Sequence, residues 1–238
     1  MKIALVGYGK MGKIIEELAI AKGHTISYKI SSANTSEVAH ITPQNTDVAI
    51  EFTQPEAAYT NVATCLKNGV PVVCGTTGWA KKQYELEKWT KENKGAFLWA
   101  SNFSIGVNLF FALNKHLAAL MAKHEQYKPE ITEIHHTEKK DQPSGTGITL
   151  AEGLLAEYPQ LGKWVNRSAN NSEELGVISV REPNVPGTHT ISYTSDEDTL
   201  SIEHTAHNRK GFAKGALLAA EWIIGKKGVF RMQDLLSL

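Results

Sequence analysis

The chain has 238 residues, enough for one large domain or two modest ones with a substantial core. Lysine plus arginine number 25, as do aspartate plus glutamate, so no overall field draws the protein to nucleic acid or to a membrane surface. Two cysteines exclude a disulfide framework, and no apolar run is long enough to span a bilayer. We therefore expect a cytoplasmic protein that binds neither nucleic acid nor membrane, with Cys74 as a buried strand residue.

A strand, a glycine turn and a helix open the chain. Residues 3–6 are apolar, and apolar side chains recur at helical spacing from Ile14. Between them lie the six turn residues Gly7, Tyr8, Gly9, Lys10, Met11 and Gly12. In such a turn the first glycine permits a tight bend, the second lets a pyrophosphate approach the backbone, and the third lets helix and strand pack closely. The six residues predict a dinucleotide site; the alternative is a purely structural turn.

The strand predicted at 24–30 ends without the carboxylate that usually binds the ribose hydroxyls of NAD. Lys29, Ser31 and Ser32 stand there instead, so a 2′-phosphate meets no repelling acid. NADPH is at least as acceptable as NADH, with Ser31 as a contact. Lys29 could instead point to solvent, and Glu37 could supply the missing acid if the loop folds back. The sequence therefore leaves the choice between NADH and NADPH open.

Strands and helices then alternate. We predict strands at 47–52, 70–74 and 96–100, and helices at 56–68 and 81–93. This alternation indicates an α/β, Rossmann-type, doubly wound parallel sheet. Ligands bind at the carboxyl ends of such strands, where Phe52, Thr53, Gly75 and Thr76 lie.

A long apolar helix is expected at 104–124, followed by a strand at 131–136 and a helix at 146–157. His135, His136 and Lys139 leave that strand beside the helix start at Gly145 and Thr146. Backbone N–H groups at a helix start attract anions, and imidazole suits proton transfer near neutral pH. The segment predicts proton transfer on an acidic small molecule, although a polar strand end and an ordinary helix cap explain the same residues.

A polar surface loop at 159–175 should lead to strands at 177–181, 188–194 and 199–204, whose alternation is typical of antiparallel pairing. This second α+β domain, with an open mixed or antiparallel sheet, would occupy residues 104–211. The helix after Gly211 would return to the dinucleotide-binding domain, giving it residues 1–103 and 212–238. An open sheet exposes an apolar face, so we expect it to be buried against copies of the chain.

His189, His204 and His207 raise the question of a metal site with His135 or His136. The sequence offers neither an H-E-x-x-H pattern nor supporting cysteines, so we expect no metal.

Residues 135–146 carry His-His, then Lys139, Asp141 and Pro-Ser-Gly-Thr, a long run that resembles the signature of the dihydrodipicolinate reductases. The resemblance covers essentially the whole chain. In that family the turn matching Gly75, Thr76 and Thr77 contacts the nicotinamide part of the cofactor. A second family segment at the cofactor site matches Ala100, Ser101, Asn102 and Phe103, with Ser101 replacing the more usual alanine.

The resemblance implies a homotetrameric, NAD(P)H-dependent reductase of lysine and diaminopimelate biosynthesis. Its substrate would be the cyclic imine dicarboxylate 4-hydroxy-tetrahydrodipicolinate. His135 and Lys139 would deliver a proton, while His136, Gly145 and Thr146 would bind a substrate carboxylate. Two other functions stay open: another small imino- or amino-acid reductase, and a non-catalytic regulator that binds NAD(P)H.

Overall fold

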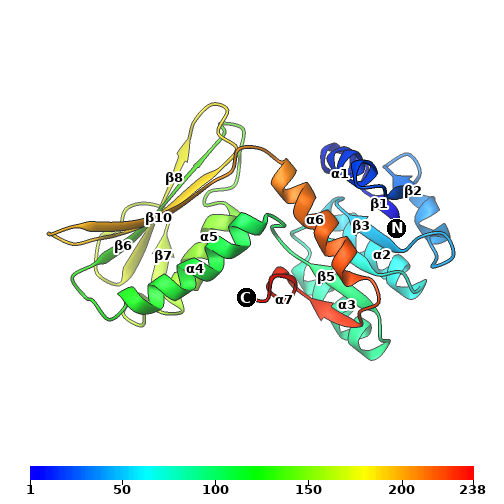
Figure 1. Cartoon of the computed structure of the whole chain (residues 1–238). Coiled ribbons are helices and arrows are strands. Elements are labelled where there is room, and N and C mark those ends of the chain that lie inside the picture. Colours follow the sequence, from blue (N-terminus) through cyan, green and yellow to red (C-terminus); the bar gives the residue numbers. More distant parts are fainter. The chain divides into compact units, whose positions relative to one another are not determined.

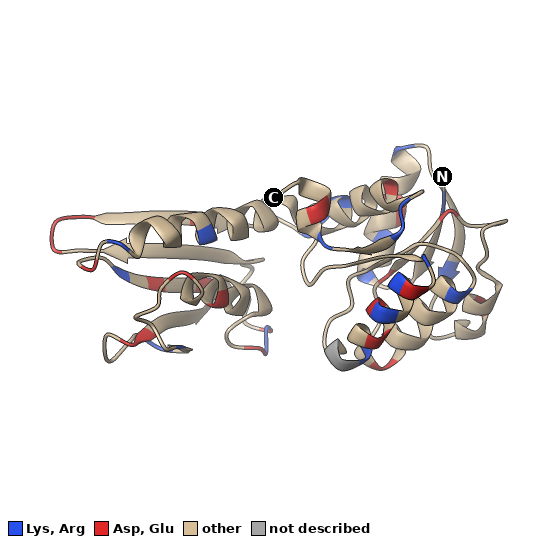
Figure 2. Cartoon of the chain, turned by 90° about the horizontal axis from the view of Figure 1, so that it is seen from below, with Lys and Arg blue, Asp and Glu red and all other residues tan. Residues whose placement is uncertain are grey.

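The computed structural model describes the backbone of residues 1–238 and every side chain except those of residues 80 and 81. The chain forms two compact units, one made of residues 1–105 and 210–238 and the other of residues 106–209. None of the helices in the described part of the chain is long and apolar enough to cross a membrane. Figure 2 shows acidic and basic residues interspersed along the elements.

The first unit is built on a six-stranded sheet in the order β11-β5-β4-β3-β1-β2, and each neighbouring pair is parallel. Its strands are β1 (Lys2–Val6), β2 (Thr25–Ile30), β3 (Val48–Glu51), β4 (Val72–Cys74), β5 (Ala96–Trp99) and β11 (Gly228–Phe230). The central strands are short, buried on both faces and apolar except for Glu51 at the end of β3. Their parallel pairing confirms the predicted sheet.

Helices cover both faces of this sheet (Figure 1). They are α1 (Lys10–Ala21), α2 (Pro55–Lys67), α3 (Ala80–Glu92), α6 (Lys210–Ile223) and α7 (Met232–Leu236), with a 3₁₀ helix at Thr35–His40. Helices α1 and α6 share one apolar cluster, and α2 and α3 share the other. The strand order reverses between β1 and β3, and in such sheets ligands bind at the carboxyl ends of the strands beside this reversal.

The second unit holds a mixed five-stranded sheet in the order β10-β9-β6-β8-β7. Its elements are β6 (Lys128–His135), β7 (Lys163–Val165), β8 (Glu174–Arg181), β9 (Thr188–Thr194), β10 (Thr199–Thr205) and α5 (Gly145–Leu155). Helix α4 (Ile105–Met121) begins at the boundary of the two units. Helices α4 and α5 contribute to one core with inward side chains of β6, β8 and β9 (Figure 1).

The prediction that the strand beginning near Val177 is antiparallel was wrong, because β8 runs parallel to both β6 and β7. Strand β6 lies between β8 and β9, so these two strands, although consecutive in the chain, do not pair with each other. Strand β7 was also missed, since three residues inside a polar segment are too few to show an alternation.

Candidate active site

Every residue predicted to bind the cofactor follows the end of a parallel strand in the first unit. The glycine turn follows β1, Ser31 follows β2, Phe52 and Thr53 follow β3, residues 75–77 follow β4, and residues 100–103 follow β5. Because the five strands are parallel and adjacent, their carboxyl ends lie along one edge of the sheet. The fold thus brings these dispersed segments together.

The glycine turn has the backbone that its sequence requires. Gly7 has a φ of +101°, and a Cβ there would lie 2.0 Å from the carbonyl oxygen of Phe52. A Cβ on Gly12 would lie 2.7 Å from the carbonyl oxygen of Gly7. At Gly9, by contrast, a Cβ would meet no atom of the described chain within 4 Å. The turn is therefore closed toward the protein and open above Gly9, at the start of α1, as a bound pyrophosphate needs.

The ends of β3 and β4 are joined by hydrogen bonds. The Thr53 amide donates to Oγ1 of Thr76 at 2.8 Å, and a Cβ on Gly75 would collide with the ring of Phe52. The Thr76 carbonyl accepts from the indole nitrogens of Trp79 and Trp99, each at 2.8 Å. Sequence reasoning missed both tryptophans because they act on a backbone atom.

The end of β5 is buried against α6. Phe103 is almost fully buried, and its ring centroid lies 5.7 Å from that of Phe52. A Cβ on Gly215 would lie 1.7 Å from the Phe103 carbonyl oxygen, so glycine is required where α6 crosses this segment. Ser101 is exposed, whereas Ala100 is buried.

The loop after β2 makes its own hydrogen bonds. Asn34 Oδ1 accepts from the Ser31 amide at 2.8 Å. The Lys29 ammonium lies 2.6 Å from a carboxylate oxygen of Glu16 and 5.3 Å from the ring centroid of Tyr8. Lys29 is thus exposed but does not stand alone, because a carboxylate from α1 pairs with it.

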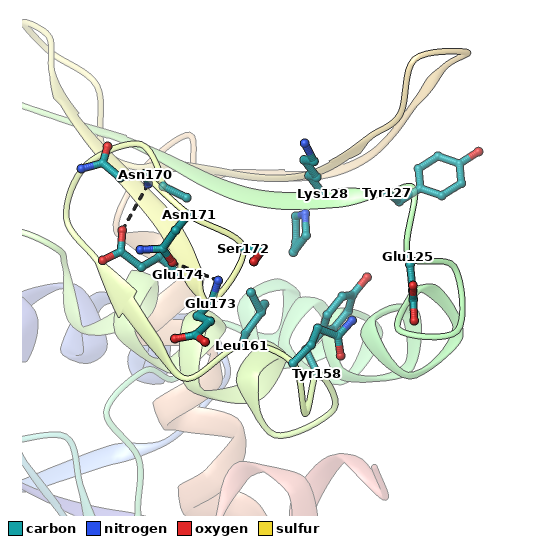
Figure 3. Close-up of a pocket in the computed structure, with 13 residues that line it drawn as sticks. Glu125, Tyr127, Lys128, Tyr158, Leu161, Asn170, Asn171, Ser172, Glu173 and Glu174 are labelled. Carbon is teal, nitrogen blue, oxygen red and sulfur yellow. Dashed lines mark hydrogen bonds between the residues drawn. The ribbon is translucent and has the colours of Figure 1, made fainter.

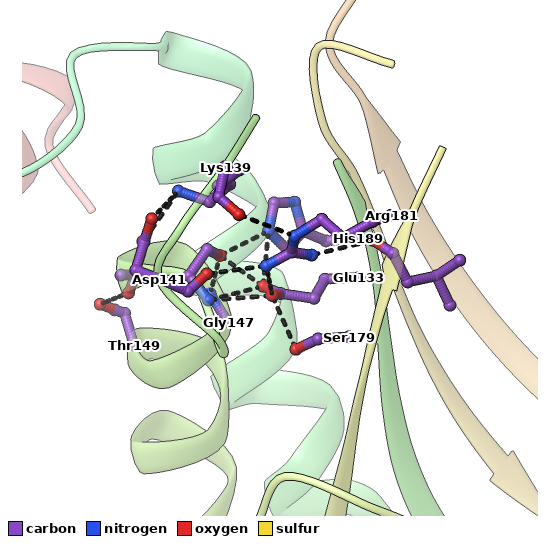
Figure 4. Close-up of polar contacts among 11 residues, drawn as sticks. Glu133, Lys139, Asp141, Gly147, Thr149, Ser179, Arg181 and His189 are labelled. Carbon is purple, nitrogen blue, oxygen red and sulfur yellow. Dashed lines mark hydrogen bonds and ion pairs between the residues drawn. The ribbon is translucent and has the colours of Figure 1, made fainter. Parts of the chain in front are cut away.

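In the second unit, polar residues occupy one row across the inner face of the sheet. Strand register sets Glu133 of β6 between Ser179 of β8 and His189 of β9. The next row toward the strand end pairs His135 with Arg181. One row earlier, the same face is apolar, with Ile131 at the centre. The inner face thus changes from core to polar site within one strand. Figure 4 shows the polar part, with Glu133 among Ser179, His189 and Arg181.

Glu133 is the centre of this cluster. Its carboxylate is fully buried and accepts hydrogen bonds from the Ser144 amide at 2.9 and 3.0 Å, from the Ser144 hydroxyl, and from the Ser179 hydroxyl at 2.9 Å. Burial alone raises the pKa of Glu133, but the nearby His189 and hydrogen bonds from Ser144 and Ser179 outweigh it and hold that pKa at about 2. The group is therefore a carboxylate at neutral pH.

His135 is buried behind the strand end. Its ring meets that of His189 edge to face, with centroids 4.9 Å apart, and its Nδ1 has no hydrogen-bond partner in the described chain. Burial, together with the neighbouring His189, lowers the pKa of His135 to about 4. At neutral pH His135 is a neutral imidazole.

Lys139 is nearer to solvent. Its ammonium donates to both carboxylate oxygens of Asp141 at 2.8 Å, and its side chain is 21% exposed. Arg181 fixes this loop by donating to the carbonyl oxygens of Lys139 at 3.2 Å and Asp141 at 2.7 Å. Arg181 thus holds the loop in place.

Helix α5 begins beside the cluster. Ser144 is its N-cap and accepts from the Gly147 amide at 3.0 Å, so the predicted carboxylate-binding residues Gly145 and Thr146 form the first turn. Gly145 is exposed and His136 is half-buried. The first turn offers amide N–H groups and the positive end of the helix dipole to an anion.

Glu133, His135 and His189 also place one potential metal-ligand atom each within 4.8 Å of one another. The carboxylate oxygens are already occupied by serine hydrogen bonds, and the Arg181 guanidinium lies 3.8 Å away. A metal cation would displace these donors and face that positive charge, so the donor set fits a hydrogen-bond network better.

The second unit has a further cavity of about 700 Å³, lined by residues 127–129 and 169–174 among others (Figure 3). It lies at the beginning of β6, whereas His135 ends the same strand, about 23 Å away at the usual rise per residue. This cavity is separate from the polar cluster.

The chain matches two family models, described as dihydrodipicolinate reductase N-terminus over residues 1–103 and C-terminus over residues 106–236. A 4-hydroxy-tetrahydrodipicolinate reductase of Christiangramia forsetii is 46% identical over 100% of this chain and 98% of its own length. One from Rickettsia bellii is 38% identical over 95% and 90%. A dipicolinate-bound dihydrodipicolinate reductase from Paenisporosarcina sp. TG-14 shares the fold, with a TM-score of 0.75, 22% identity and 97% coverage of each chain.

Proposed function

This chain belongs to the dihydrodipicolinate reductase family. On that premise we propose that its substrate is 4-hydroxy-tetrahydrodipicolinate, which loses water to give dihydrodipicolinate, and that the enzyme reduces the latter to tetrahydrodipicolinate. It is an oxidoreductase of lysine and diaminopimelate biosynthesis. The strand-end residues of the first unit would bind the cofactor, and the polar cluster of the second unit would bind and protonate the substrate.

A reduced nicotinamide cofactor supplies the hydride of this reaction. The glycine turn would hold its pyrophosphate over Gly9, where the structure leaves space for it. Residues 75–77 and 100–103 would hold the nicotinamide end. The hydrogen bond from Thr53 to Thr76 keeps two of these strand ends at a fixed separation.

We propose that the chain accepts both NADH and NADPH. The loop after β2 carries no carboxylate at residues 31–34, so it does not repel a 2′-phosphate. Lys29, the nearest cation on that strand, is already paired with Glu16, which weakens any attraction to the phosphate. These opposing features support use of both cofactors.

The first turn of α5 would bind a substrate carboxylate. Gly145 and Thr146 would present backbone N–H groups, and the imidazole of His136 would lie beside them. Ser144 caps the helix, so the first turn is held in place before the substrate arrives. Such an arrangement orients the ring for hydride addition.

Protonation on carbon is the step that the protein itself would perform. Hydride adds to the ring of the unsaturated dicarboxylate, and the resulting enamine carbon takes a proton. Lys139 would donate that proton from Nζ, because its ammonium is held on a fixed loop and is partly exposed. The lysine amine would then regain its proton from water, to which Lys139 is partly exposed. Because the pKa of His135 is about 4, its neutral imidazole would serve as a relay that takes a proton from water at one ring nitrogen and releases one from the other.

We also propose that the chain assembles as a homotetramer through the outer face of the second unit's sheet. Ile134, Ile178 and Val180 lie half-exposed among threonines and serines on this face, and the described helices of the unit share a core with the opposite face. Copies of the same sheet would bury these side chains. We place the enzyme in the cytoplasm, where reduced nicotinamide and the pathway's intermediates are available.

The observation that carries this proposal is the polar cluster, which sets an ammonium and a helix start within one short segment of a family member. The test is consumption of NADH or NADPH, with substrate formed in the cuvette by the preceding synthase from pyruvate and aspartate semialdehyde. We expect consumption that requires every component. Nucleotide binding without consumption would favour a regulator or a reductase of another imine.

A further inference from the structure

Glu133 has no role in the reaction described above, yet it is the most completely enclosed charge of the cluster. Its side chain is 0% exposed, and its contacts reach β8, β9 and the start of α5. A buried carboxylate is costly unless it is hydrogen-bonded and paired. An apolar side chain at this position would avoid that cost, so a buried carboxylate here indicates a role other than packing.

The first connection leads to the substrate-carboxylate site. Glu133 accepts from both the amide and the hydroxyl of Ser144, and the same hydroxyl accepts from the Gly147 amide. A Cβ on Gly147 would lie 2.6 Å from a Glu133 oxygen, so helix and carboxylate are in close contact. Glu133 therefore fixes where the first turn of α5 begins.

The second connection leads to the proton donor. The Arg181 guanidinium lies 3.8 Å from Glu133 and donates to the carbonyl oxygens of Lys139 and Asp141. Without the buried negative charge, this largely buried guanidinium would lose the carboxylate that it pairs with. Glu133 thus stabilises the arginine that holds the lysine loop.

The third connection fixes a histidine tautomer. The Ser144 hydroxyl donates to Glu133 and accepts from the Gly147 amide, and a hydroxyl has one donor hydrogen and two lone pairs. Nε2 of His189, 3.2 Å from the same oxygen, must therefore carry a hydrogen. The oriented ring of His189 packs against His135 and fixes its position as well.

We propose that Glu133 is a positioning residue that couples the substrate-carboxylate site at the start of α5 to the proton-donor loop at Lys139. This inference rests on the proposed function, since it assigns Glu133 a task in that same site. Ser144 transmits the position of the carboxylate to the helix, and Arg181 transmits it to the loop.

The first test asks whether substitutions on the two sides of Glu133 affect different quantities, namely dipicolinate binding on the helix side and kcat on the loop side. Ser144→Ala should weaken binding of dipicolinate, a planar dicarboxylate probe, by about tenfold while turnover at saturation changes little. Arg181→Gln should lower kcat by about 10- to 100-fold and leave dipicolinate binding nearly unchanged. Glu133→Gln should both weaken dipicolinate binding and lower kcat. In the double variant Glu133→Gln/Arg181→Gln, the fold loss of kcat should be smaller than the product of the two single fold losses, because both residues act through the same contact.

Glu174→Gln is the matched control. Glu174 is also a buried carboxylate of the second unit, and hydrogen bonds from Arg167 and the Asn170 backbone hold its pKa at about 2. It begins β8, at the opposite end of that strand from Arg181. Its loss should lower the unfolding temperature but leave kcat and dipicolinate affinity within about twofold of wild type.

The direction of the binding change is also decisive. Removing a negative charge near an anion site would by simple electrostatics tighten dipicolinate binding. Positioning predicts weaker binding in Glu133→Gln. Tighter or unchanged binding, or effects on kcat and binding no larger than those of Glu174→Gln, would overturn the proposal.

If Glu133→Gln does not fold, the Ser144→Ala and Arg181→Gln pair decides the matter, because equal effects of both on binding and kcat contradict two separate connections. Dipicolinate binding by calorimetry needs no turnover. A wild-type protein that binds dipicolinate but reduces no dihydrodipicolinate would therefore remove the proposed function. The role of Glu133 would then be tested by the dipicolinate affinities of the variants alone. A wild-type protein that reduces the substrate but does not bind dipicolinate would leave the proposed function standing and overturn the coupling, because the start of α5 would then not be a site for a dicarboxylate.

Discussion

Lys139 is the residue on which the proposed proton transfer depends most directly. Its ammonium is held by Asp141, and Arg181 holds the backbone beneath it. Lys139→Ala should lower kcat by about 100-fold or more, because general acid catalysis by a positioned group contributes about this much. Steady-state kinetics with the synthase-generated substrate would measure it.

Lys163→Ala serves as the control for Lys139→Ala. Lys163 is another ion-paired lysine of the second unit, 3.4 Å from Glu174, and it lies on the edge strand β7. Its substitution should leave kcat unchanged. Near-wild-type turnover of Lys139→Ala would remove this lysine from the mechanism.

The buried titratable groups predict a loss of stability in acid. The folded state holds the pKa of Glu133 at about 2 against an ordinary 4.5, so its contribution is present above pH 4.5 and is lost as pH falls toward 2. The pKa of His135 is lowered from 6.5 to about 4, so the unfolded chain binds a proton first and stability falls between those values too. The contribution of Glu133 to the free energy of unfolding that is lost in this way is on the order of 3 kcal/mol.

Urea unfolding between pH 2 and 7 would measure this dependence. Glu133→Gln should show a flatter curve than wild type below pH 4.5, with the His135 part above that pH retained. Parallel curves for the two proteins would mean that Glu133 is not the titrating group.

Among the individual residues, the sequence predicts those of the site that lie in one segment but not those that the fold brings together. His135, His136 and Lys139 stand in one segment with turn residues and a helix start, so spacing alone was enough to single them out. The row of Ser179, Glu133 and His189 is set by strand register, which no local pattern reveals. The pairing of Lys29 with Glu16 depends in the same way on how α1 lies beside β2.

Substitutions in the glycine turn can distinguish an effect on folding from an effect on cofactor binding. Gly9→Ala should leave the unfolding temperature nearly unchanged, because the added methyl group meets none of the described atoms within 4 Å. It should nevertheless weaken NADH and NADPH binding by about tenfold or more, because the methyl group would occupy the space proposed for the pyrophosphate. Fluorescence titration and thermal unfolding would measure the two effects.

Gly12→Ala provides the contrast. Its methyl group would lie 2.7 Å from the Gly7 carbonyl oxygen, so the turn itself must shift and the unfolding temperature should fall. If Gly9→Ala bound both cofactors as tightly as wild type, the turn would be structural and the dinucleotide site would lie elsewhere.

The elements were predictable to different degrees for physical reasons. In the first unit, helices with a clear apolar period alternate with short apolar strands, and the structure confirms the parallel sheet that this alternation predicted. Strand β11 and helix α7 were missed, because a run of three residues and a run of five carry too little pattern. The direction of β8 was wrong because chain proximity to β9 suggested a pairing that β6 prevents.

For the whole molecule, the outer face of the second unit's sheet predicts the assembly state. Ile178→Glu should dissociate the proposed tetramer into smaller species, because an unpaired carboxylate in an apolar interface is costly. Sedimentation velocity would measure it. Ile20→Glu, at a side chain of α1 that is 57% exposed, should leave the assembly intact. A wild-type monomer, or a tetrameric Ile178→Glu protein, would contradict this interface.

The proposed function requires that the chain transfer a hydride from C4 of a reduced nicotinamide to a ring carbon of the substrate. The most direct measurement supplies NADPH or NADH doubly deuterated at C4 of the nicotinamide, with substrate from the synthase, and determines by mass spectrometry where the deuterium goes. We predict tetrahydrodipicolinate that carries one deuterium on a ring carbon. Unlabelled product, or cofactor that keeps both deuterium atoms, would contradict the claim.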